Sequence, residues 1–146
     1  MSRNTLILAV CLVGIILSLL LVGVVSTTLL RHVFQITPVV AALVAVARRA
    51  KWGKYAAIPI LIFWFIIMLF IWLYLLGIAR IVSGRFTPVE IVSTVMVGLC
   101  CLCGVVSSLR IPTVASRTLR ILVFVIFAVL QVGAMRLSLS PFVSHH

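Results

Sequence analysis

Few side chains in this 146-residue sequence could do chemistry, and one of them is its single acidic residue, Glu90. One carboxylate inside a membrane can be the whole coupling site of a small proton-coupled transporter. Glu90, however, stands three residues after Thr87 with Pro88 between them, and this order is typical of the capping box that begins a helix. We therefore expect Thr87 and Glu90 to cap a helix. The alternatives for Glu90 are a coupling role and a salt bridge to Arg85 or to another helix.

The four cysteines raise the question of a metal or redox site. Cys100, Cys101 and Cys103 lie close together, and Cys11 is distant in the sequence. Adjacent cysteines on a helix point about 100° apart, so their thiolates do not converge. Zinc-ribbon and CxxC spacings are absent. We interpret these cysteines as small packing residues and expect no metal site and no disulfide.

Histidine offers no better route to catalysis. His32 is the only internal histidine, because His145 and His146 lie in the C-terminal tail. We interpret His32 as a polar residue at the membrane interface. With one carboxylate and one internal histidine, we expect no catalytic residues, no cofactor and no enzyme activity.

The composition indicates where such a chain resides. Hydrophobic residues make up 65% of the chain and charged residues 9%, and the mean hydropathy is +1.44. A soluble domain of this size could not bury so much apolar surface. The twelve Lys and Arg residues lie at the ends of apolar runs, which is typical of headgroup anchoring and not of nucleic-acid binding. The chain is predicted to be a polytopic membrane protein.

The apolar runs predict an all-α bundle of five transmembrane helices in a single domain. The longest uncharged run, from Ala56 to Ala79, reaches roughly 36 Å as a helix, enough to cross a hydrocarbon layer of about 30 Å. The first run is longer than the apolar core of a signal peptide, so we expect it to remain as a span. The predicted spans are about 5–26, 28–47, 56–79, 89–109 and 119–136.

The second span has an alternative. Thr37 and Pro38 could be the cap and first residue of a shorter helix, which would leave four spans plus a membrane-dipping segment. We favour a full span over 28–47, because membrane helices tolerate proline more readily than soluble ones.

The basic loops predict the orientation. Loops 48–55 and 110–120 hold most of the Lys and Arg residues, so both are expected in the cytoplasm, with the C-terminus outside a bacterial inner membrane. If 28–47 does not span, only the N-terminus changes side. The cations expected to contact anionic headgroups are Arg48, Arg49, Lys51 and Lys54.

The fourth span is rich in small residues at spacings that let helix backbones approach closely. We expect this face to pack on the bulky third span, whose Trp64, Met68 and Trp72 recur at helical spacing. The residues of the small face are Thr94, Gly98, Cys101, Gly104 and Ser108.

In the five-span arrangement, polar side chains gather near the outer ends of the helices, at depths of up to roughly 10 Å. They could form an electropositive pocket for an anionic headgroup, a small anion or a partner's carboxylates. The favoured interpretation is simpler: the cations extend to the interface, and each glutamine bonds to a neighbouring helix. The residues of this cluster are Arg31, His32, Gln35, Arg80, Gln131 and Arg136.

These observations favour a non-enzymatic membrane protein that binds other membrane subunits or itself, as an accessory or assembly subunit of a complex. The alternative is a small homo-oligomeric transporter or channel, in which Glu90, Gln35 or Gln131 would face an aqueous path. A membrane enzyme acting on lipid or quinone is the least favoured hypothesis, because its usual acid, histidine or metal cluster is missing.

Overall fold

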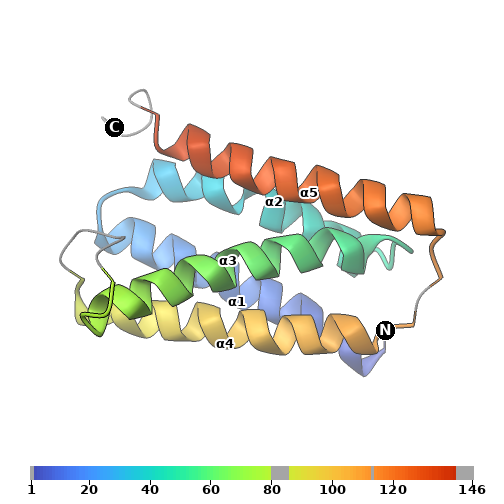
Figure 1. Ribbon diagram of the computed structural model, residues 1–146, viewed down its shortest axis with the longest axis horizontal. Helices are drawn as coiled ribbons and strands as arrows, with labels where there is room; N and C mark the ends of the chain where they lie inside the picture. The colour runs from blue at the N-terminus through green and yellow to red at the C-terminus, as the bar shows by residue number, and fades with distance from the viewer. Residues whose placement is uncertain (1, 80–85, 113, 141–146) are drawn as a thin grey trace.

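The computed structural model describes residues 2–79, 86–112 and 114–140, and these residues form five α-helices and no strand (Figure 1). Each helix is long and apolar enough to cross a membrane, which confirms the predicted five-span transmembrane bundle. The helices are α1 (Arg3–Val25), α2 (Leu29–Ala47), α3 (Gly53–Leu75), α4 (Pro88–Arg110) and α5 (Arg117–Ser138).

Helix α2 is continuous across Pro38, so the alternative of a shorter helix that begins at Thr37 and Pro38 is wrong. Thr37 lies inside the helix and donates its hydroxyl to the carbonyl of Val33 at 3.0 Å. Side chains that bond to the backbone in this way are one means by which membrane helices accommodate proline.

Helix α3 is displaced from the apolar run that predicted it. It spans Gly53–Leu75 and not 56–79, because Gly77 adopts a left-handed φ of +73° just beyond its end. The N–H groups of Gly77 and Ile78 bond back to carbonyls of the last turn, which is the Schellman arrangement. An apolar run indicates which residues can lie in lipid, but it does not indicate where the helix ends. The helix ends where the backbone reverses direction.

Helix α4 begins with a capping box. The Thr87 hydroxyl accepts the Glu90 N–H at 3.3 Å, and the Glu90 carboxylate accepts the Thr87 N–H at 2.7 Å. The alternative pairing of Glu90 with Arg85 lies outside the described residues. Ser2 and Ser116 cap α1 and α5 by accepting an N–H of the first turn.

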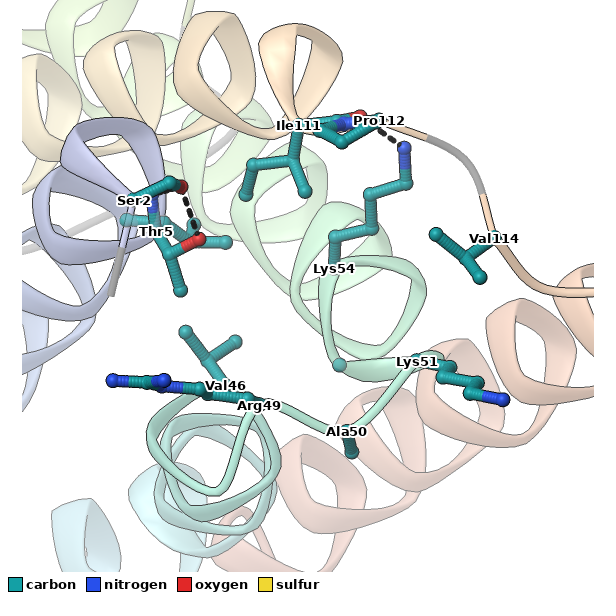
Figure 2. Close-up of a pocket in the computed structure, with 12 residues that line it drawn as sticks. Ser2, Thr5, Val46, Arg49, Ala50, Lys51, Lys54, Ile111, Pro112 and Val114 are labelled. Carbon is teal, nitrogen blue, oxygen red and sulfur yellow. Dashed lines mark hydrogen bonds between the residues drawn. The ribbon is translucent and has the colours of Figure 1, made fainter.

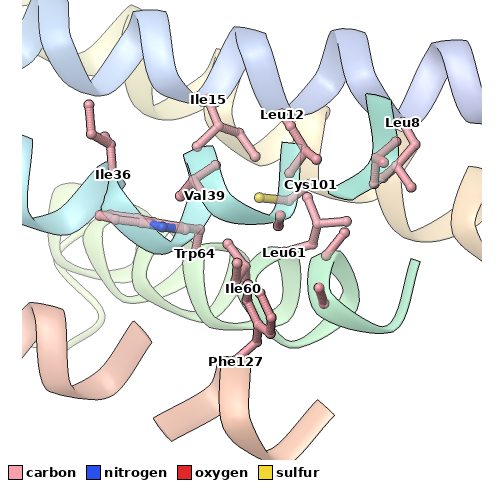
Figure 3. Close-up of a cluster of buried hydrophobic side chains, with 14 of the residues drawn as sticks. Leu8, Leu12, Ile15, Ile36, Val39, Ile60, Leu61, Trp64, Cys101 and Phe127 are labelled. Carbon is pink, nitrogen blue, oxygen red and sulfur yellow. The ribbon is translucent and has the colours of Figure 1, made fainter. Parts of the chain in front are cut away.

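The five helices run side by side, and their connections gather at two ends (Figure 1). We call the end with the N-terminus, the α2–α3 turn and the α4–α5 connection the basic end, and the opposite end the far end. Helix α3 packs against α2, α4 and α5, and α1 packs against α2 and α4. Between them lies a core of fully buried side chains (Figure 3), which includes Leu8, Leu12, Ile15, Val39, Ile60 and Leu61.

The small face of α4 lies inside the bundle, and all five of its predicted residues are buried. A Cβ atom on Gly98 would lie 2.3 Å from the indole ring of Trp72, so only glycine fits beneath this ring. The Trp72 Nε1–H donates to the Thr94 hydroxyl at 3.1 Å. Trp64 and Met68 contribute instead to a cavity described below.

Candidate functional site

A cavity of about 420 Å³ lies in the far-end half of the bundle and is lined by residues of all five helices. Its wall combines apolar side chains with an unusual number of polar ones for a membrane interior. The polar side chains that line it are Ser18, Ser26, Thr28, Arg31, His32, Gln35, Glu90, Ser93 and Thr94.

The charged residues of this cavity lie near its mouth. Helices α2 and α4 both begin at the far end, so Arg31, His32 and Glu90 belong to their first turns. Trp64 of α3 lies about three turns below the end of its helix, at a depth of roughly 16 Å. The cavity therefore joins a charged mouth to a mostly apolar interior.

The Trp64 ring lines this interior, but its Nε1–H is closed to solvent. Its side chain is 2% exposed, and its Nε1–H has no acceptor among the described residues. An unpaired buried donor costs about 1–3 kcal/mol, so such groups normally meet a ligand or an ordered water. Trp72 lies about two turns further along α3. In contrast to Trp64, its Nε1–H has an acceptor, the Thr94 hydroxyl.

Hydroxyl groups of the α1–α2 turn hold the imidazole at the mouth. His32 Nδ1 lies 3.1 Å from the Thr28 carbonyl oxygen and 3.2 Å from the Thr28 hydroxyl. Ser26 and Thr28 share a further hydrogen bond of 2.6 Å between their hydroxyls. The ring is thereby fixed before any ligand enters, which lowers the entropic cost of binding.

The predicted cluster is only partly brought together. Arg31, His32 and Gln35 line the cavity, whereas Gln131 and Arg136 do not, and Arg80 lies outside the described residues. Glu90, which we expected mainly as a helix cap and did not include in this cluster, also lines it. The mouth therefore carries both signs of charge, unlike the purely electropositive pocket that the sequence offered as the less favoured alternative.

The two glutamines connect α2 to α5. Gln35 Nε2 donates to the Ser138 hydroxyl at 2.9 Å, and Gln131 Nε2 donates to the Gln35 carbonyl at 3.3 Å. Gln131 is fully buried. These contacts agree with the simpler interpretation, in which each glutamine bonds to a neighbouring helix. Gln35 serves both the cavity wall and the helix contact.

Sequence reasoning missed the hydroxyls of the cavity wall and the role of Trp64. Ser18 is nevertheless a visible signal, because it is the only hydroxyl within the apolar part of the first run. Ser93 is a similar hydroxyl in an apolar span. It is harder to single out from the sequence, because its helix contains many other small residues. A single hydroxyl in an otherwise apolar span often faces a polar cavity or a neighbouring helix.

Cys11, Cys100 and Cys101 lie at the contact between α1 and α4, whereas Cys103 is exposed. All four thiols are free, and Cys11 and Cys101 are buried. A Cβ atom on Gly14 would lie 2.8 Å from Cys100 Sγ, so this sulfur occupies space that glycine leaves open. Among the described residues, no three His, Cys, Asp or Glu side chains are grouped so that they could hold a metal ion.

A smaller cavity of about 260 Å³ lies at the basic end (Figure 2). Lys54, expected at headgroup level, is instead buried, and its Nζ donates to the Ile111 carbonyl at 2.6 Å because α3 already begins at Gly53. Arg49 and Lys51 point away from each other in this view. These cations do not converge on one ligand position.

The fold and the far-end cavity describe a small polytopic membrane protein with a site of mixed polarity. No known protein family, no curated protein and no solved structure matches the chain. The function is therefore argued from the geometry of the site.

Proposed function

We propose that this chain is a non-enzymatic integral membrane protein that acts through binding, as an accessory or assembly subunit of a membrane complex. The observation that carries the proposal is the far-end cavity of about 420 Å³, with its charged mouth, the hydroxyl groups of its wall and the Trp64 ring inside. Its hydroxyl, amide and indole groups are suited to recognise a small polar molecule or a polar segment of a partner.

A small homo-oligomeric transporter or channel is the second candidate, since Gln35 and Glu90 both line the cavity. Below Trp64, however, the bundle is filled by fully buried side chains such as Leu12 and Ile60. Within one chain the cavity thus leads into an apolar core, which supports binding over conduction.

The proposal includes an orientation in a bacterial inner membrane. Arg3, the basic loops and their flanking residues would lie in the cytoplasm, with Arg48, Arg49 and Lys51 near anionic headgroups. The far-end cavity and the C-terminus would then face outside. The excess of Lys and Arg at the basic end supports this arrangement.

Reporter fusions test the orientation. Alkaline phosphatase is expected to be active when fused at residue 84 or the C-terminus, and inactive at residue 52 or the N-terminus. A fluorescent protein should give the opposite pattern, because it fluoresces only on the cytoplasmic side. Phosphatase activity at residue 52 would refute the orientation.

Filling the cavity tests the binding function. Ser93 is 5% exposed and lines the cavity, so Ser93→Phe should occupy the space of a ligand. Protein purified in mild detergent is expected to retain a bound molecule or partner, and native mass spectrometry should show about tenfold less of it on the variant.

The matched control for this experiment is Met96→Phe, on the lipid-facing side of the same helix, where the side chain is 51% exposed. It should retain the bound species. A wild-type protein that purifies only as a bare monomer would contradict the binding function. Flux in proteoliposomes that Glu90→Gln or Gln35→Ala abolishes would favour the transporter instead.

A further inference from the structure

The basic end holds a second cavity, of about 350 Å³, between the first turns of α3 and α5. Tyr55 lines it from α3, and Arg117, Arg120, Ile121 and Phe124 line it from α5. The four α5 residues recur at steps of three and four, so they share one face of the helix. The arginines occupy the first turn, and the apolar side chains lie deeper along the helix.

Arg117 and Arg120, the two cations that line this cavity, have no acidic side chain beside them among the described residues. The Lys54 ammonium lies 5.0 Å from the centre of the Tyr55 ring, and the Arg120 guanidinium lies 5.9 Å from it. The only acidic side chain, Glu90, caps α4 at the far end. A counter-anion for Arg117 and Arg120 must therefore come from outside the protein's side chains.

Arg120 also supplies a buried donor. Its Nε is inaccessible to solvent and has no acceptor among the described residues. A ligand in the cavity can therefore meet only the rest of the Arg120 guanidinium, which is cationic and is best satisfied by an anionic oxygen. The N-terminus of α5, which begins at Arg117, adds the positive end of the helix dipole at the same position.

We propose that this cavity binds a phosphate ester group, and specifically that of an acidic phospholipid in the leaflet at the basic end. Arg117 and Arg120 hold the phosphate oxygens, and the Tyr55 ring keeps the Arg120 guanidinium in place. Ile121 and Phe124 contact the apolar part of the lipid below the phosphate. This apolar wall favours a lipid over free phosphate. The site is separate from the far-end cavity.

Lipid binding to the full-length protein in detergent tests the proposal. Native mass spectrometry is used with phosphatidylglycerol, phosphatidylcholine and inorganic phosphate as separate probes. Phosphatidylglycerol is expected to bind at least about tenfold more tightly than phosphatidylcholine, and Arg117→Gln or Arg120→Gln should each weaken it about tenfold. Arg136→Gln, the same change at the opposite end of α5, is the control and should have no effect.

Three results would overturn the proposal. If Arg136→Gln weakens phosphatidylglycerol binding as much as Arg117→Gln, the lipid responds only to diffuse charge. If inorganic phosphate displaces the lipid, the site takes free phosphate. If Arg120→Gln lowers thermal stability in lipid-free detergent while exposed Arg117 can be replaced without loss of lipid, the arginines are structural.

Discussion

Gly98→Ala is expected to destabilise the bundle by about 1–3 kcal/mol, because the added methyl group overpacks the α3–α4 contact. Its Cβ would lie 2.3 Å and 2.7 Å from two ring carbons of Trp72. The ring is held by its hydrogen bond to Thr94 and by an edge-to-face contact with Phe65, whose centroid lies 6.5 Å away. Denaturation of the purified protein in detergent measures the loss.

Gly133→Ala in α5 is the matched control, since no heavy atom lies within 4 Å of its Cβ position. It should unfold at or above the wild-type midpoint, because alanine favours the helix over glycine. Replacing Trp72 with leucine should relieve the effect of Gly98→Ala. A Gly98→Ala variant with wild-type stability would show that the Trp72 ring does not rest on Gly98.

The number of helices was predictable because a membrane makes each span an apolar run of fixed minimum length. The start of α4 was predictable for a local reason, since the groups that cap it are adjacent in the sequence. The end of α3 was predicted incorrectly. The run to Ala79 continues beyond Gly77, where the left-handed residue already ends the helix.

The candidate site was less predictable than the fold. Helical rise places Arg31 and Gln35 near the far end, but it does not say which neighbour each side chain faces. Likewise, Trp64 and Trp72 were predicted to share one ridge against α4. Steps of four residues turn a helix by about 40°, so two steps separate these side chains by roughly 80°. Trp72 therefore meets α4, whereas Trp64 lines the cavity.

Leu61→Ala is expected to cost about 2–5 kcal/mol, the usual range for truncating a fully buried leucine. Its methyl groups fill the space over Gly104, and the same space is bordered by Cys11 of α1. Three helices thus meet at this side chain. Leu69→Ala is the control on the same helix, because Leu69 is 41% exposed on the lipid-facing surface and its truncation should cost far less.

A second substitution at the same contact separates lost packing from other effects of the truncation. A Cβ on Gly104 would lie 3.0 Å and 3.1 Å from the two Leu61 methyl carbons, which belong to the end of a flexible side chain. Gly104→Ala alone should therefore cost less than Gly98→Ala. In the Leu61→Ala background, the same methyl group enters vacated space and should restore part of the lost stability. If the double variant is less stable than Leu61→Ala, the methyl group does not fill the vacated space, and α3 and α4 contact each other elsewhere.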